Sequence, residues 1–176
     1  MDGRKIRPAT PEDLAAILDI LDAARHIMWD SGNLLQWVPG YPAVATIQTD
    51  IEKGGGFVFE EEDSDTGAGR IVGYFACLPS PEPTYRVIYD GAWLDDKQPY
   101  HVVHRLASYP DVHGIFQEAL DYSFSLSPNI RIDTHRDNAI MRHLIRKAGF
   151  SYCGIIHLAN GDPRLAFQKT ITSKEK

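Results

Sequence analysis

The sequence predicts an α/β domain in which helices cover both faces of a mixed central sheet. Apolar residues make up 43% of the 176 residues and charged residues 24%, as in a globular chain that can bury one substantial core. Stretches with helical spacing of apolar residues alternate with short stretches of strand-forming residues. No repeat and no long flexible linker divides the chain. We therefore expect a single domain over residues 1–172, followed by a charged tail at 173–176.

The first expected elements are a strand and a helix. Residues 4–10 form the strand. Thr10 is the expected N-cap of the helix, with Pro11 at its first position and Asp13 three residues after the cap, as in a capping box. Apolar residues then follow at helical spacing: Leu14, Ile17, Leu18, Leu21, Ala24 and Met28.

An aromatic loop, a second helix and a hairpin come next. Residues 28–42 mix turn formers with aromatic residues and are expected to be irregular. The second helix spans 43–53 and stops at three consecutive glycines. The stretches "GFVFEEE" and "RIVGYFACLP" predict the two strands of a hairpin, joined by an acidic turn. Residues 84–94 predict a further strand or an irregular extended segment.

In the C-terminal half, strands and helices alternate. "YHVVHRLASY" predicts a strand, and a helix over 111–126 follows with one apolar stripe. "NIRIDTH" is a short buried strand, and "DNAIMRHLIRKAGF" is a helix that stops at Gly149. Two strands, "FSYCGIIHL" and "RLAFQKT", are joined by the turn residues "ANGDP".

Composition and charge disfavour several classes of function. The net charge of −6 provides no overall positive field to attract nucleic acid. Cys77 and Cys153 are too few and too far apart for a metal cluster or a disulfide framework, and we expect both to be reduced and packed. No segment has the apolar length of a signal peptide core or a membrane span. We expect a cytoplasmic protein that binds no metal, nucleic acid or membrane, and a homodimer is compatible with the sequence.

Two stretches resemble a known family. "IRIDTHRDNAIMRHLIRKAGFSYCGII" is similar to the strand, helix and K-x-G-F strand entry of the GNAT-superfamily N-acetyltransferases. "HRLASYPDVHGIFQEALDYS" lies where that family has its coenzyme A-binding strand, loop and helix. The resemblance implies a GNAT-like, mostly antiparallel sheet of about six to seven strands flanked by about four helices. It also implies an enzyme that moves an acetyl group from acetyl-CoA, as co-substrate, to a primary amine of a small molecule or peptide by direct attack.

The loop at 111–116 is the predicted anion site. Unpaired N–H groups at a helix N-terminus can hold a pyrophosphate, with help from the helix dipole. The family's R/Q-x-x-G-x-G/A loop falls on these residues, and Gly114 keeps its first glycine, whereas Asp111 adds a negative charge and Phe116 a large ring. A tight strand-to-helix turn with no ligand is the structural alternative.

The resemblance also assigns the cofactor arm. It implies that main-chain groups near residues 106–108 pair with pantetheine and polarise the thioester carbonyl, and that Asn138 contacts the arm, although a buried strand and a helix N-cap are the structural alternatives. The predicted cofactor-binding residues are Leu106, Ala107, Ser108, Val112, His113, Gly114, Ile115, Phe116 and Asn138.

Direct attack by an amine needs a base for the ammonium proton and an acid for the leaving thiolate. His104 is one predicted base, because histidine changes charge near neutral pH and this one precedes the thioester-binding stretch. Glu60, or its neighbour Glu61, is the alternative and would act through water. The family's usual acid, a tyrosine, is replaced by Ile145, so another group or water must serve, or turnover is weak.

Four aromatic residues are candidates for an acceptor pocket: Trp37, Tyr41, Tyr89 and Trp93. Core packing is the structural alternative for each of them. The net charge disfavours an acidic acceptor and leaves a small amine or a peptide N-terminus. The alternative function is a catalytically weak or inactive module that binds or senses acyl-CoA on the same fold.

Overall fold

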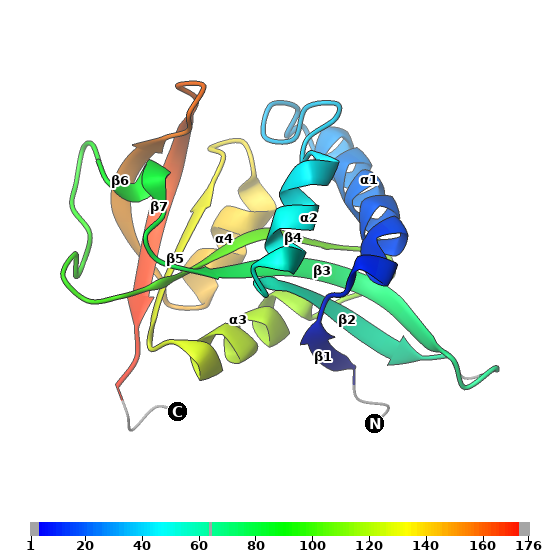
Figure 1. Cartoon of the computed structure of the whole chain (residues 1–176). Coiled ribbons are helices and arrows are strands. Elements are labelled where there is room, and N and C mark those ends of the chain that lie inside the picture. The colour runs from blue at the N-terminus through cyan, green and yellow to red at the C-terminus, as the bar shows by residue number, and fades with distance from the viewer. Residues whose placement is uncertain (1–3, 64, 173–176) are drawn as a thin grey trace.

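The computed structural model describes residues 4–63 and 65–172, and within them seven strands form one sheet (Figure 1). The predicted tail at 173–176 lies outside these residues. The strand order is β1-β2-β3-β4-β5-β7-β6. The strands are β1 Lys5–Pro8, β2 Gly56–Glu62, β3 Gly69–Pro79, β4 His101–Ser108, β5 Asn129–Thr134, β6 Ser151–His157 and β7 Pro163–Thr170. Only β4 and β5 pair in parallel, so the predicted mixed, mostly antiparallel sheet is confirmed.

Four α-helices of the described residues cover both faces of the sheet, as predicted (Figure 1). On β2, Val58 packs with residues of the first two helices, whereas Phe57 and Phe59 pack with residues of the last two. Because successive side chains of a strand point to opposite faces, the two helix pairs lie on opposite sides. The helices are α1 Leu14–Asp30 and α2 Val44–Glu52 on one side, and α3 Ile115–Leu126 and α4 Ala139–Lys147 on the other.

The predicted signals at the helix ends are present. The N–H of Thr10 donates to Asp13 Oδ2 at 2.8 Å, although the turn that it caps, Pro11–Asp13, is a 3₁₀ turn that leads into α1. Asn138 Oδ1 accepts from the N–H of Met141 at 3.0 Å and caps α4. Gly149 follows that helix with φ of +84°, a conformation that glycine adopts at little cost.

One predicted element needs correction. The helix expected over 111–126 begins only at Ile115, because Gly114 has φ of +84° and the preceding turn is closed by the Val112 N–H, which donates to Tyr109 O. The segment 84–94, expected to be a strand or an irregular extended segment, is irregular. It continues from the 3₁₀ turn Pro83–Tyr85 and makes one isolated bridge to β6.

Both cysteines are free and buried, as predicted, and burial raises the pKa of each thiol. Among residues 4–63 and 65–172, no helix combines the length and the apolar character needed to cross a membrane.

Candidate active site

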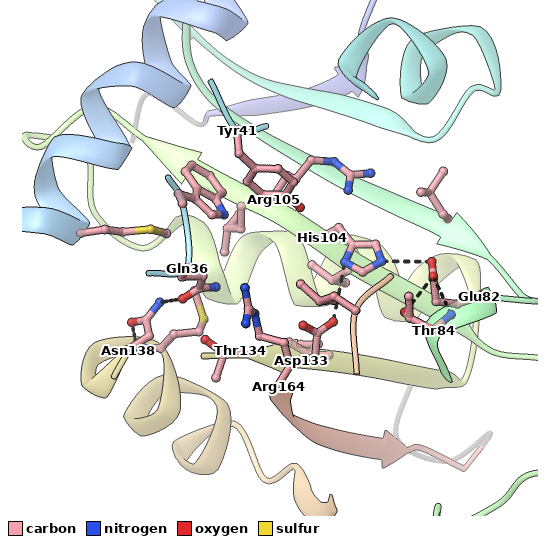
Figure 2. Close-up of a pocket in the computed structure, with 18 of the residues that line it drawn as sticks. Gln36, Tyr41, Glu82, Thr84, His104, Arg105, Asp133, Thr134, Asn138 and Arg164 are labelled. Atoms are coloured by element: carbon pink, nitrogen blue, oxygen red, sulfur yellow. Dashed lines mark hydrogen bonds and ion pairs between the residues drawn. The ribbon is translucent and has the colours of Figure 1, made fainter. Parts of the chain in front are cut away.

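The candidate site lies where the two parallel strands separate. β4 and β5 pair only at His101 with Ile130 and at Val102 with Arg131. Beyond these pairs, a cavity of about 240 Å³ lies between the strands (Figure 2). The separation leaves the β5-facing edge of β4 without a strand partner, and an unpaired strand edge can bind an extended ligand through its main chain.

Residues from both sides of the sheet line the cavity. Phe116 and Met141, from the side of α3 and α4, line it together with Asn138. From the opposite side, Met28 of α1 and Trp37 of the following loop line it as well.

β4 carries one extra residue beside the cavity. Tyr74 pairs with Ala107 and Ala76 with His104, so three steps along β4 match two along β3. Arg105 lies in this bulge with φ of +54°. A bulge redirects the main chain and side chains around it, and here it lies between His104 and the stretch 106–108 that the resemblance assigns to the thioester.

His104 lies between two carboxylates (Figure 2). Its Nε2 is 3.3 Å from Glu82 Oε2, and its Nδ1 is 3.9 Å from Asp133 Oδ1. Both the N–H and the hydroxyl of Thr84 donate to Glu82 Oε1. Burial opposes ionisation of Glu82, but the hydrogen bonds from His104 and Thr84 outweigh it and lower its pKa to about 2. Tyr85 donates its hydroxyl to Asp133 Oδ1. Two acidic side chains thus flank the imidazole.

Sequence reasoning found His104 but missed Glu82 and Asp133. Glu82 is in the segment that connects β3 and β4, and Asp133 is in β5. The three residues have no motif spacing, because tertiary structure alone brings their segments together. A carboxylate inside the short buried strand "NIRIDT" is the sequence signal that would have marked Asp133 for attention.

The turn before α3 has main-chain donors that the protein does not use. In the described part of the chain, no N–H of residues 113–117 donates to another protein atom, whereas the N–H of Val112 is bonded to Tyr109 O. The ring of Phe116 is buried in the core and also lines the cavity. Free N–H groups at a helix N-terminus are the donors that an anion needs.

Charged side chains next to this turn form ion pairs. Glu118 Oε1 would lie 3.6 Å from a Cβ atom added at Gly114. Arg4 Nη1 donates to that oxygen at 2.7 Å and to His113 O at 3.1 Å. Arg4 Nη2 also pairs with Glu61 Oε1 at 2.8 Å, so two carboxylates share this one guanidinium beside the start of α3.

Of the other predicted cofactor-binding residues, some line the cavity and others pack in the core or shape the turn before α3. Leu106 lines the cavity, whereas Ala107 is buried against α1 on one face of the sheet. The hydroxyl of Ser108 donates to Tyr109 O and Val112 O and shapes the turn. Val112 and Ile115 are buried in the core.

Asn138 is both a cap and a wall of the cavity. Besides capping α4, it donates from Nδ2 to Gln36 Oε1 at 2.9 Å. This bond ties the loop after α1 to the start of α4, on two sides of the cavity. The helix-cap interpretation is confirmed, and the cofactor contact stays a prediction.

Several predicted residues lie outside the cavity. The carboxylate of Glu60 is paired with Arg7 at 3.2 Å. Ile145 is fully buried in the core under α4 and does not line the cavity. Of the four aromatic candidates, Trp37 and Tyr41 line the cavity.

The other two aromatic candidates pack at the far end of the sheet. Trp93 is buried, and the guanidinium of Arg131 lies 3.9 Å from the centre of its ring. Tyr89 stacks on His157 with ring centres 4.8 Å apart. For both residues, packing is the role that the structure supports, because neither lines the cavity.

Comparisons with known proteins define the class. An acetyltransferase of the GNAT family from Streptococcus agalactiae is 32% identical, with 97% of each chain covered and a TM-score of 0.82. One from Listeria monocytogenes is 22% identical over 96% of this chain and 95% of that chain, with a TM-score of 0.70. A chain in the NatC complex bound to Gag peptide and CoA is 13% identical over 96% and 99% of the two chains, with a TM-score of 0.56. No protein-family model and no curated protein matches.

The fold is that of a GNAT-family acetyltransferase. The full-length similarity to the Streptococcus agalactiae structure shows the family, and the chain belongs to the GNAT family of acetyltransferases. The expectation drawn from the sequence is confirmed for the family and the fold.

Proposed function

We propose that this protein transfers an acetyl group from acetyl-CoA to a primary amine, with His104 as the base. The observation that carries the proposal is the position of His104. It lies between Glu82 and Asp133 inside the opening of the sheet, one residue before the bulge in β4. An amine that enters the cavity as an ammonium ion is attracted by the two carboxylates and meets a base there.

The residues around the cavity fit acetyl-CoA, which supplies an activated acetyl group when bound. The N–H groups of residues 113–117 would hold its pyrophosphate. The unpaired edge of β4 near Leu106 would hold the pantetheine arm, and the N–H groups of this edge would polarise the thioester carbonyl. The CoA in the structurally similar NatC complex supports this choice of ligand.

The proton balance assigns a role to His104. It takes one proton from the ammonium ion, and the free amine nitrogen attacks the carbonyl carbon. A C–N bond forms, the C–S bond breaks, and sulfur leaves with the bonding electron pair. The attacking nitrogen then loses its second proton, and water relays a proton to the leaving thiolate, because Ile145 replaces the family's acid and is buried away from the cavity. His104, which lies between Glu82 and Asp133, releases the first proton to solvent.

The test is free-thiol release from acetyl-CoA across a panel of primary amines. We expect turnover by the wild type and a loss of kcat of about 100-fold or more for His104→Gln, within the usual range for a lost base. Calorimetry should give both proteins the same affinity for acetyl-CoA. Failure of the wild type to bind acetyl-CoA contradicts the proposal. Binding of acetyl-CoA without turnover on any amine would instead favour an acyl-CoA-binding module. The presence of Ile145 in place of the family's tyrosine also favours that function.

A further inference from the structure

Arg164, near the start of β7, is a buried cation without an acidic partner. Arg164 is only 5% exposed to solvent, and Figure 2 shows its side chain pointing into the cavity beside Asp133 and Thr134. Nη1 donates to Pro163 O at 2.9 Å. Within residues 4–63 and 65–172, no carboxylate oxygen lies within 4.0 Å of its guanidinium nitrogens.

A second arginine in the same cavity shows the contrast. Arg105 donates from Nε and Nη2 to the two oxygens of Asp50, so its charge is fully paired. Removing a guanidinium from water is costly unless an anion compensates it. Arg164 has no such anion from the protein, and its guanidinium faces the space into which an acceptor would enter.

The neighbouring hydroxyl of Thr134 is also unsatisfied. Thr134 lines the cavity and is fully buried, and its Oγ1 has no hydrogen-bond partner among the described residues. It lies on β5 opposite Leu165, the residue after Arg164 on β7. Side chains of β7 alternate between the two faces of the sheet, so Thr134 and Arg164 leave the sheet on opposite sides, and the guanidinium of Arg164 is the unused donor that a carboxylate in the cavity can meet.

We infer that the acceptor is a free amino acid, whose carboxylate binds Arg164 while its amine lies toward His104. The inference rests on the proposed function and names its substrate class. Such a zwitterion has a positive end for Glu82 and Asp133 and a negative end for Arg164. It has no net charge, so the net charge of −6 of the protein does not repel it.

Coenzyme A does not explain the unused guanidinium equally well. In the sheet, β7 lies beyond β5 on the side away from β4. The N–H groups that suit the pyrophosphate precede α3, a helix that packs against β3, β4 and β5. Arg164 is instead next to the turn after β6, whose Leu158 also lines the cavity. The acceptor end of the cavity thus carries the free cation.

The test compares each acceptor with the same molecule lacking its negative charge. The panel consists of the standard L-amino acids, β-alanine and 4-aminobutyrate, each beside its primary carboxamide. With the wild type, we expect a higher kcat/KM for the best amino acid than for its carboxamide. Arg164→Gln should lower kcat/KM for the amino acid by about 10- to 100-fold, mainly through KM, as expected for the loss of hydrogen bonds to a charged group. The same variant should leave kcat/KM for the carboxamide unchanged.

A control variant keeps the test decisive. Arg136→Gln, whose side chain is 76% exposed, is the matched control and should behave as the wild type. Calorimetry can also measure how tightly the matching N-acetyl amino acid binds to the wild type and to Arg164→Gln, each saturated with CoA. This measurement requires no turnover, and Arg164→Gln should lose about 10- to 100-fold in affinity.

The outcomes separate this inference from the proposed function. Equal use of amino acids and carboxamides, or an equal loss for both in Arg164→Gln, would overturn the assignment of the carboxylate while leaving acetyl transfer intact. Turnover of peptide N-termini in preference to free amino acids would overturn it as well. If no amine is acetylated and the N-acetyl amino acids do not bind, both the proposed function and the inference fail.

Discussion

Arg105 donates two hydrogen bonds to Asp50, at 2.8 and 2.7 Å, from the bulge in β4. A non-glycine residue rarely adopts the φ of +54° that Arg105 has, so its neighbours must hold it there. Tyr74 adds a third hydrogen bond to Asp50 at 2.8 Å. This buried group connects α2, β3 and β4, and it fixes the strand on either side of the bulge, where His104 and Leu106 face the cavity.

We expect Asp50→Asn to destabilise the protein and to reduce turnover. The substitution keeps the shape of the side chain but leaves the guanidinium of Arg105 buried without its counter-charge, which should lower the free energy of unfolding by about 3–5 kcal/mol. Urea denaturation measures the change. Asp22→Asn, which breaks an exposed pair with Arg25, is the control and should cost at most about 1 kcal/mol. Equal losses for the two variants would show that the buried pair does not hold the bulge.

Gly114→Ala should weaken acetyl-CoA binding through the main chain. An added Cβ would meet no atom closer than Glu118 Oε1 at 3.6 Å, so the cost comes from φ of +84° and not from a clash. Gly161→Ala is the matched control, because Gly161 has φ of +88° in the turn between β6 and β7 and no atom near the added Cβ. Each should lose about 1–2 kcal/mol of stability. Calorimetry should show weaker acetyl-CoA binding for Gly114→Ala alone, and equal affinities would argue against an anion site at this turn.

The two bonds of Asn138 can be separated by substitution. Asn138→Ala removes the cap of α4 and should lower the free energy of unfolding by about 1 kcal/mol. Asn138→Asp keeps an oxygen acceptor at the N-cap but loses the Nδ2 donor to Gln36, so it should be more stable than the alanine variant. Thermal unfolding ranks the three proteins. An alanine variant as stable as the wild type would mean that the cap contributes nothing.

Acid should remove the stabilising effect of Glu82. Its pKa is about 2 in the folded protein against an ordinary value of 4.5, so the ionised carboxylate stabilises the fold above about pH 4.5. This contribution is lost progressively as the pH falls from there toward 2. We expect the wild type to be more stable than Glu82→Gln at pH 6 and the difference to shrink steadily in acid. A difference in unfolding free energy that stays constant over this range would contradict the environment described for Glu82.

Local signals made most of the fold predictable from the sequence. The cap at Thr10, the stop at Gly149 and the apolar run of "GFVFEEE" act over a few residues, and the structure confirms each. The segment 84–94 is irregular, one of the two forms expected for it, and it bridges only at Tyr89 to the outer strand β6. Whether such a stretch becomes a strand depends on partners elsewhere in the sheet, which leave no mark in the stretch itself.

The site was less predictable, for the same reason. His104 was found from its place on a strand, but Glu82, Asp133 and Arg164 come from three other segments. Trp93 was a candidate for the acceptor pocket, with core packing as the alternative, because aromatic residues are common in both places and the sequence does not distinguish them. In the structure it packs on the guanidinium of Arg131. The bulge at Arg105 depends on Asp50, far away in the chain, so neither residue could have indicated it alone.

Hydrogen exchange tests the central claim most directly, namely that the opened sheet and the turn before α3 bind acetyl-CoA. The measurement compares deuterium uptake by residues 113–117 and by β4 with and without saturating acetyl-CoA. We predict strong protection of both segments, because the free N–H groups of the turn and the unpaired edge of β4 would gain acceptors. Uptake that is unchanged in both segments, while calorimetry shows acetyl-CoA bound, would contradict the account.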